Sequence, residues 1–225
     1  MKLKDKISYY IWSTNHRKHL DSLQEKYSAL YTGVVLDIGG RDRGLFKKPR
    51  ENVDEWIYAD VVSKHNPDLL LDVSDMNNVP SESVDIVNTI ELFEHVLNIE
   101  VGLDECHRVL RSNGLFICAM PFLYRVHADP SDFQRWTKGK WEYELKKRGY
   151  AIESFHITGG IFSVILDASM NIVKAFPRGI RHIFAIPFIF FNFLSVLDNF
   201  DFIRKNSVLG SYHSGYFFIA RKTKV

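Results

Sequence analysis

The stretch that decides the fold is VVLDIGGRDRG, residues 34–44. An apolar run ends in the acid Asp37, and glycines follow at once, the first of them Gly39. This pattern is typical of a strand that enters a tight turn where the backbone passes close to a ligand. A second apolar segment, WIYAD, ends in Asp60, and an acid about 20 residues beyond such a turn is placed to bind the two hydroxyls of a ribose. The sequence therefore predicts a nucleoside cofactor across the ends of the first two strands.

The glycine spacing bears on two competing nucleoside chemistries. A dinucleotide site needs G-x-G-x-x-G at the start of a helix, so that the pyrophosphate lies at the helix N-terminus, and residues 39–44 do not have that spacing. S-adenosylmethionine has no phosphate to bind, and it needs an acid near its amino group and a glycine near its ribose. Asp37 and Gly39 meet these needs, although ordinary strand–turn–helix punctuation explains the glycine cluster equally well.

The composition limits the classes of partner. The chain has 225 residues, 46% of them hydrophobic, and a formal net charge of +2. These values suit one elaborated domain with a full core and give no global basic field for nucleic acid. The two cysteines, Cys106 and Cys118, exclude a disulfide framework and a cysteine-rich zinc site, and residues 1–12 lack the apolar core of a signal peptide. We expect a cytoplasmic protein with no nucleic-acid partner and no metal ion.

From residue 33 onward the pattern alternates between strands and helices. Residues 5–31 are expected to be helical, with a break at 13–15. Strands are predicted at 34–38, 56–60, 84–89, 115–120, 151–158 and 215–221, and helices at 98–111 and 141–149. Asn113 and Gly114 are expected to form the turn into the strand at 115–120. Regular alternation with short crossovers predicts a parallel, doubly wound α/β sheet whose ligands bind beyond the carboxyl ends of the strands.

Four further stretches carry a family resemblance. Residues 83–96, SVDIVNTIELFEHV, resemble S-F-D-x-V followed by L-E-H-V of one methyltransferase group. Residues 104–118, DECHRVLRSNGLFIC, resemble its E-x-x-R-V-L-K-P-G-G stretch, and residues 121–137, PFLYRVHADPSDFQRWT, resemble its P-F-x-Y-x-x-H-x-x-P-x-D-F-x-R-x-T stretch. With DLLLD at 68–72, these motifs follow in family order from residue 33 to about 150. The chain thus resembles a class I S-adenosylmethionine-dependent methyltransferase of the methyltransferase-11 type.

The resemblance implies a fold and a division of the chain. The family fold is a Rossmann-like seven-stranded sheet with helices on both faces, whose last strand is antiparallel and forms a hairpin with the sixth. The strands predicted at 151–158 and 215–221 fit that hairpin, so residues 160–213 are expected to be a helical insertion between strands six and seven. We expect an N-terminal helical segment, residues 1–32, followed by a methyltransferase domain, residues 33–225.

The resemblance also implies a site for S-adenosylmethionine. Asp37 is expected to organise the methionine amino group, Gly39 to admit the ribose and Asp60 to bind the ribose hydroxyls. Asp72 is expected to accept a hydrogen bond from the adenine amino group, with Val73 packing nearby. The residues expected to line the methionine end of the site are Thr89, Ile90 and Glu91. Arg41 departs from the family pattern, which usually has a glycine at this position.

The loop that contains His127 offers the side chains that methyl transfer to a hydroxyl group would require. Transfer from a sulfonium is an in-line displacement for which the protein chiefly positions the nucleophile, and a hydroxyl nucleophile also needs a proton acceptor. His127 is the predicted catalytic residue, because the unperturbed pKa of histidine is near ~6.5. Tyr124, Asp132 and Arg135 share its loop and are predicted to bind the acceptor. The alternative is a structural lid whose polar groups satisfy one another. Glu94 and His95 are interpreted as structural.

The insertion bears on substrate and partners. Relatives with such loops often act in glycan or cell-envelope pathways, which implies a small-molecule, sugar or lipid-linked glycan acceptor, methylated at oxygen. Basic residues flank the apolar run 183–197, a pattern that suits an interfacial segment on anionic lipid. Peripheral membrane contact through 160–213 is therefore one expectation, and burial of the run in the protein's own pocket or in a homodimer is the other. The alternative function is a non-catalytic nucleoside-binding or partner-docking domain of the same fold.

Overall fold

The computed structural model describes residues 3–41, 44–128 and 130–223, without the side chains of residues 3 and 186–189. The chain forms two compact units. Unit 1 consists of Met1–Leu23, Leu123–Arg125 and Ile157–Gly215, and unit 2 consists of Gln24–Phe122, Val126–His156 and Tyr216–Val225. Each unit thus combines segments that are distant in sequence, whereas the predicted division at residue 32 follows the chain order.

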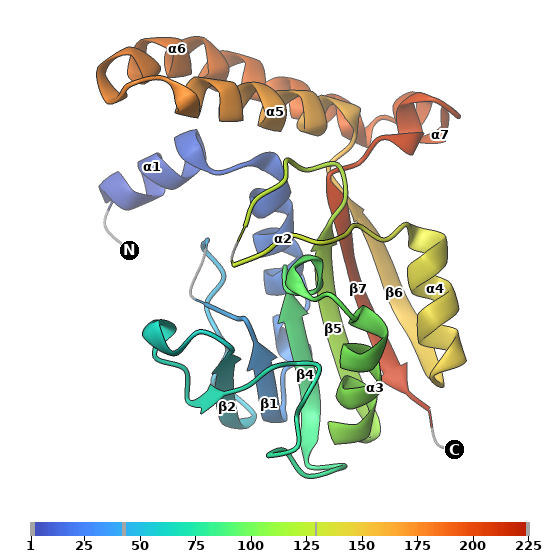
Figure 1. Ribbon diagram of the computed structural model, residues 1–225. Coiled ribbons are helices and arrows are strands. Elements are labelled where there is room, and N and C mark those ends of the chain that lie inside the picture. The colour runs from blue at the N-terminus through green and yellow to red at the C-terminus, as the bar shows by residue number, and fades with distance from the viewer. Residues whose placement is uncertain (1–2, 42–43, 129, 224–225) are drawn as a thin grey trace. The chain divides into compact units, whose positions relative to one another are not determined.

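Unit 2 is built on a seven-stranded sheet with the strand order β3-β2-β1-β4-β5-β7-β6 (Figure 1). The strands are β1 (Gly33–Ile38), β2 (Val53–Asp60), β3 (Leu69–Leu70), β4 (Val84–Ile90), β5 (Leu110–Pro121), β6 (Tyr150–Thr158) and β7 (Gly215–Lys222). The pairs β1–β2, β1–β4, β2–β3 and β4–β5 are parallel. The last strand, β7, lies between β5 and β6 and is antiparallel to both (Figure 1). This arrangement confirms the predicted Rossmann-like α/β fold.

The largest difference from the predicted strand boundaries is at β5. The strand expected at 115–120 already begins at Leu110, which pairs with Val84 of β4. Asn113, with φ of +66°, lies inside this strand at an irregularity in the β4–β5 register, so the prediction that Asn113 and Gly114 form a turn before the strand is wrong. A β-bulge uses the same left-handed backbone conformation as a turn, and the dipeptide alone does not distinguish the two.

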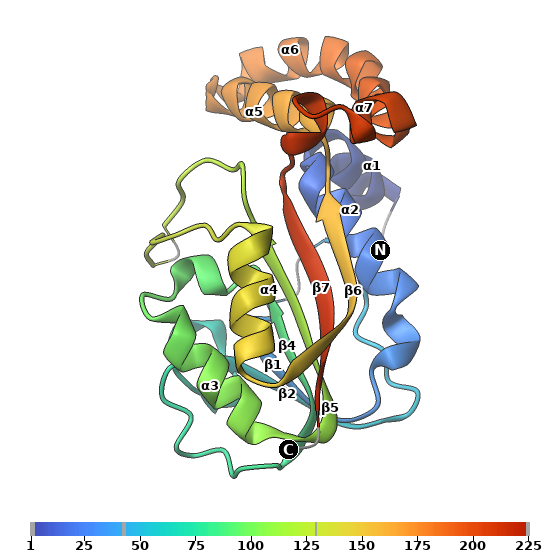
Figure 2. The ribbon, with the colours of Figure 1, turned by 90° about the vertical axis from the view of Figure 1, so that its right-hand side faces the viewer.

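Helices α3 (Ile99–Val109) and α4 (Lys138–Lys147) cover one face of the sheet (Figure 2). The buried residues of α3 recur at helical spacing and include Ile99, Leu103, Cys106 and Val109. They join Trp141 and Leu145 of α4 in the main core. On the opposite face, Tyr27 precedes the short helix η1 (Ser28–Leu30) and stacks on Phe217 of β7 with ring centroids 6.0 Å apart. Successive side chains of a strand point to opposite faces of the sheet, so Phe217 contacts Tyr27 on this face while Phe218 joins the main core on the other.

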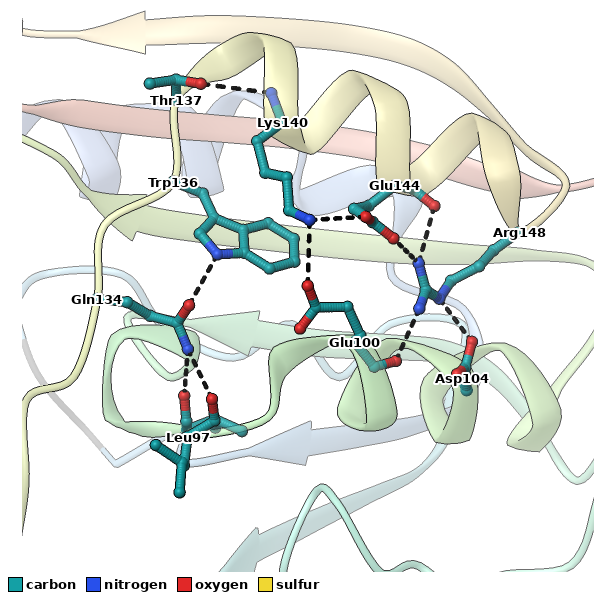
Figure 3. Close-up of polar contacts among 10 residues, drawn as sticks. Leu97, Glu100, Asp104, Gln134, Trp136, Thr137, Lys140, Glu144 and Arg148 are labelled. Atoms are coloured by element: carbon teal, nitrogen blue, oxygen red, sulfur yellow. Dashed lines mark hydrogen bonds and ion pairs between the residues drawn. The ribbon is translucent and has the colours of Figure 1, made fainter.

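A polar network joins α3, α4 and the loop before α4 (Figure 3). Lys140 of α4 donates to Glu100 of α3 at 3.1 Å and to Glu144 at 2.7 Å. Arg148 pairs with Glu144 and donates to Asp104 of α3 at 2.6 Å. The pairs of Glu100 with Lys140 and of Asp104 with Arg148 are partly exposed and individually weak, whereas the pair of Arg148 with Glu144 is buried, and together they connect the two helices.

Unit 1 is mainly helical, as predicted for residues 160–213. Its elements are α1 (Leu3–Trp12), the first part of α2 (Asn15–Lys26), α5 (Ile161–Ala175), α6 (Arg178–Phe191), η4 (Asn192–Asn199), α7 (Asp201–Lys205) and η5 (Leu209–Ser211). The contacts between α5 and α6 include the buried cluster of Met170, Val173 and Ala185. Among the described residues, no helix combines the length and the apolar character needed to cross a membrane.

Two buried carboxylates cap helix N-termini within unit 1. Asp167 of α5 accepts hydrogen bonds from the backbone amides of Asn15 at 2.6 Å and His16 at 3.0 Å, at the start of α2. Asp198 of η4 accepts from the amides of Gly160, Phe162 and Ser163 at 2.9–3.0 Å, at the start of α5. A negative charge at a helix N-terminus satisfies backbone donors that have no partner within the helix. The contacts of Asp167 join residues 15–16 to the insertion, and those of Asp198 lie within the insertion.

Candidate active site

A cavity of about 420 Å³ lies at the carboxyl ends of β1, β2 and β4 in unit 2. Its lining comes from the ends of these strands, the segment after β3 and the loop before α4. The lining residues are Ile38, Gly39, Arg41, Asp60, Val61, Val62, His65, Leu71, Asp72, Val73, Ser74, Glu91, Leu92, His95, Val96, Leu97, Asn98, Pro130, Ser131 and Phe133. The cavity is therefore at the edge of the sheet where the sequence predicts a ligand.

The turn after β1 depends on two glycines. Gly39 has φ of +72°, and its amide donates to Ala59 of β2 at 2.7 Å. A Cβ atom on Gly40 would lie only 1.9 Å from Oδ1 of Asp37. The first glycine is thus required by its conformation, and the second because the carboxylate of Asp37 packs against its Cα. The predicted role of Gly39 next to a ligand fits its place in the cavity wall.

The carboxylate of Asp37 is buried behind this turn. It accepts hydrogen bonds from Nδ2 of Asn88 at 2.7 Å and Nε1 of Trp56 at 3.0 Å, and Nζ of Lys48 lies 3.2 Å away. Burial raises the pKa of Asp37, and the Lys48 charge and the two hydrogen bonds oppose that rise. Asp37 is not among the described lining residues, so its predicted contact with a methionine amino group stays a prediction.

Asp60 lines the cavity at the end of β2. Its carboxylate accepts from the Tyr58 hydroxyl at 2.7 Å and the Val62 amide at 2.8 Å, and it lies 2.9 Å from Nδ1 of His65. Burial alone would raise the pKa of Asp60, but these three hydrogen bonds outweigh it and hold the pKa below its usual value. Asp60 is therefore ionised at neutral pH. Nη1 of Arg41 lies 3.2 Å from Nε2 of His65, which extends this polar chain along the wall.

The other predicted cofactor residues divide into two groups. Asp72, Val73 and Glu91 line the cavity. Thr89 and Ile90 are not among the lining residues and are buried in β4. At the end of β4, the first residue in the cavity wall is therefore Glu91, which follows the strand and has a φ of +54°.

The loop of residues 126–137 carries the predicted catalytic histidine. Nδ1 of His127 lies 3.3 Å from Oδ2 of Asp132, and its backbone amide donates to the same oxygen at 2.8 Å. Arg135 donates to Asp132 at 2.7 Å and lowers the pKa of that carboxyl to about 2. The structure thus brings together His127, Asp132 and Arg135. Tyr124 belongs to unit 1, where its ring lies 6.4 Å from that of His16.

Two histidines that the sequence analysis does not assign to the site, His65 and His95, line the cavity beside the predicted residues. His65 binds Asp60, and its signal in the sequence is only a position shortly after the second strand. His95 was interpreted as structural, yet it lines the cavity, and its ring meets that of His127 edge to face with centroids 5.2 Å apart. His127 itself is not among the described lining residues and contacts His95, which is.

The comparisons with known proteins agree with this geometry. Residues 51–118 match a family model described as a methyltransferase domain, and no protein of curated function matches the chain. The structure is similar to that of a protein from Bacillus halodurans C-125 described as a methyltransferase, with 16% identity, 91% of this chain and 99% of that chain covered, and a TM-score of 0.57. It is also similar to Haemonchus contortus phosphoethanolamine N-methyltransferase 2 in complex with S-adenosyl-L-methionine, with 14% identity, 92% and 52% covered, and a TM-score of 0.55.

A third similar structure limits what the fold says about the reaction. The [4+2]-cyclase SpnF has 14% identity, 92% of this chain and 81% of that chain covered, and a TM-score of 0.57. SpnF is described as a [4+2]-cyclase rather than a methyltransferase, so at such identities the likeness shows the fold, and the reaction must be argued from the residues of the site. Residues 51–118 thus match a methyltransferase-domain model, and the order of the seven strands with the cavity at their carboxyl ends gives the chain the Rossmann-like methyltransferase fold.

Proposed function

We propose that this protein binds S-adenosylmethionine in the cavity and transfers its methyl group to an oxygen of a small-molecule, sugar or lipid-linked glycan acceptor. The observation that carries the proposal is the ionised carboxylate of Asp60 in the wall, on the strand next to the glycine turn. A carboxylate there can accept hydrogen bonds from ribose hydroxyls, while Gly39 admits the ribose to the backbone. A volume of about 420 Å³ is within the range of small-ligand pockets.

The remaining lining residues suit the other parts of the cofactor. Leu71 and Val73 are buried apolar side chains in the wall, and the carboxylate of Asp72 beside them is an acceptor for an adenine amino group. Glu91 supplies a third carboxylate, after β4, where the methionine end is expected. When bound, S-adenosylmethionine supplies an electrophilic methyl group on a positively charged sulfur. These residues position that methyl group and exclude water, which is the main task of the protein in such a displacement.

His127 is proposed as the proton acceptor for the hydroxyl that is methylated. The carboxylate of Asp132 beside Nδ1 favours the tautomer with its proton on Nδ1 and leaves Nε2 able to accept a proton. Arg135 in turn holds Asp132 in its ionised form. The alternative is a non-catalytic nucleoside-binding or partner-docking domain of the same fold. Binding of S-adenosylmethionine without formation of any methylated product would favour that alternative.

The cofactor proposal predicts the effect of Asp60→Ala. We expect the affinity for S-adenosylmethionine, measured by calorimetry, to fall about tenfold to a hundredfold, because a hydrogen bond to a charged group contributes roughly 1.5–3 kcal/mol. Asp54→Ala is the matched control, since Asp54 is an exposed acid on the same strand. Unchanged affinity in Asp60→Ala would remove Asp60 from the cofactor site.

We further propose that unit 1 contacts anionic lipid surfaces. Large apolar side chains are exposed on α6, η4 and α7, among them Ile183, Phe190, Phe193 and Phe202, with 65–75% of each side chain accessible. Exposed basic residues accompany them, at Arg178 before the apolar run and at Arg204 and Lys205 after it. Aromatic and aliphatic side chains beside arginine and lysine are the composition of interfacial helices.

Vesicle binding tests the lipid proposal. The purified chain should bind vesicles that contain phosphatidylserine more strongly than purely zwitterionic ones, and binding should weaken as salt rises, because salt screens the basic residues. Replacing Phe190, Phe193 and Phe202 by serine should abolish binding, whereas Tyr143→Ser, at an exposed aromatic on α4 of unit 2, should not. Absence of vesicle binding together with a concentration-dependent dimer in solution would favour the homodimer alternative.

A further inference from the structure

Three potential metal ligands converge in unit 2. Glu94, His95 and His127 each offer one ligand atom, and these atoms lie within 4.8 Å of one another. Nε2 of His95 is 3.7 Å from Oε1 of Glu94. Glu94 is fully buried, and both histidines are half-buried. Two imidazoles and one carboxylate are a donor set that binds first-row transition metals in proteins.

The protonation of both rings is set by groups outside the cluster. Nδ1 of His95 is hydrogen-bonded to the backbone carbonyl of Ser131, and a carbonyl can only accept. His95 therefore carries its proton on Nδ1 and has its lone pair on Nε2, the atom that faces Glu94. Oδ2 of Asp132 lies 3.3 Å from Nδ1 of His127, and an acceptor at this position favours the same tautomer there. Metal-binding histidines are commonly oriented by a carbonyl or carboxylate at the other ring nitrogen.

The two segments that carry the cluster are fixed to each other. Glu94 and His95 lie in the short helix η3 (Phe93–His95), and His127 lies in the loop 126–137. The backbone amide of Phe133 in this loop donates to the carbonyl of Glu94 at 2.8 Å.

Gln134 adds a second attachment between the same two segments. Its Nε2 donates to the carbonyls of Val96 at 2.8 Å and Leu97 at 3.0 Å. Its Oε1 accepts a hydrogen bond from Nε1 of Trp136 at 2.8 Å (Figure 3). Ligands about 2.0–2.2 Å from one tetrahedral ion are about 3.3–3.6 Å apart, so the cluster closes around an ion when its ligand atoms approach one another by about 1 Å.

We propose that Glu94, His95 and His127 bind one divalent transition-metal ion of the Zn²⁺ type. Mg²⁺ and Ca²⁺ are disfavoured, because they prefer sites made entirely of oxygen ligands. Three protein ligands leave coordination positions open, and His95 also lines the cavity, so an open position can take an oxygen of the acceptor. Binding of the ion does not depend on methyl transfer, and the inference therefore stands apart from the proposed function.

The ion changes the role of His127. A nitrogen lone pair that binds an ion cannot also accept a proton, so His127 would be a ligand in the metal-bound protein. The ion would then lower the pKa of an acceptor hydroxyl bound to it, as bound metal ions do for water. The sequence predicts no metal, because two of the ligands are adjacent and the third lies on a separate loop, a spacing that matches no common metal motif.

Direct metal binding tests the inference. The full chain, dialysed against a chelator, is titrated with Zn²⁺ by calorimetry and with Co²⁺ by its visible d–d absorption, and Mg²⁺ serves as the comparison. We expect one Zn²⁺ or Co²⁺ per chain, with much weaker binding of Mg²⁺. Glu94→Gln and His127→Asn should each lower the Zn²⁺ affinity by at least about tenfold. His156→Asn, which removes a half-buried imidazole from β6, should leave it unchanged.

Thermal unfolding separates loss of a ligand from loss of the fold. The metal-free chain and His127→Asn should have similar Tm values, and addition of Zn²⁺ should raise Tm only for the original chain and for His156→Asn. Absence of stoichiometric Zn²⁺ and Co²⁺ binding would overturn the inference. An equal loss of binding in His127→Asn and His156→Asn, or in neither, would overturn it as well.

Discussion

Gly40→Ala is expected to abolish binding of S-adenosylmethionine. The new Cβ would lie 1.9 Å from Oδ1 and 2.1 Å from Cγ of Asp37, so one of the two residues must move. Asp37 is 1% exposed and held by Asn88 and Trp56, and moving it breaks hydrogen bonds to a buried charge. Overpacking costs roughly 1–3 kcal/mol, and each lost hydrogen bond to a charged group roughly 1.5–3 kcal/mol. We expect an affinity loss of about a hundredfold or more.

The matched control for this substitution is Gly139→Ala. A Cβ atom on Gly139, in the first turn of α4, meets no atom within 4 Å. Its affinity for S-adenosylmethionine, measured by calorimetry, should equal that of the original chain. Circular dichroism shows whether Gly40→Ala still folds. A folded Gly40→Ala variant with unchanged affinity would show that the glycine turn does not shape the cofactor site.

His127→Ala is expected to lower turnover by about a hundredfold or more while the affinity for S-adenosylmethionine stays nearly the same. General-base catalysis contributes roughly 10²–10⁴ to the rate, and His127 is not among the residues that line the cavity. The measurement is formation of S-adenosylhomocysteine with an acceptor that the original chain methylates. Val126→Ala, at the exposed neighbouring position, controls for disturbance of the loop. Turnover within about threefold of the original would show that the loop is a structural lid.

The same loss of turnover is expected whether His127 accepts a proton or binds a metal ion. Treatment of the original chain with a chelator distinguishes the two roles. A proton acceptor keeps its activity without metal, whereas a metal ligand loses it and regains it when Zn²⁺ is returned. The two roles therefore give opposite results with one protein and one substrate.

Six of the seven strands could be predicted from the sequence because they depend on local pattern, whereas the two-residue strand β3 is not among the predicted strands. Apolar runs that end in Asp37 and Asp60, with glycines after the first, mark β1 and β2 and the ligand-binding edge between them. The motif order then implies the antiparallel seventh strand, which the structure confirms. Local pattern was insufficient at Asn113, where a bulge and a turn require the same backbone conformation.

Only the tertiary structure decided which side chains meet. The carboxylate of Asp37 lies behind the turn because Trp56, Asn88 and Lys48 arrive there from other segments. Glu94 and His95 converge with His127 because backbone and side-chain hydrogen bonds fix the loop 126–137 to η3. Local periodicity determines which residues form a strand or helix and which way they face. Contacts between segments far apart in the chain depend instead on how those elements pack, and no local pattern in the sequence encodes that packing.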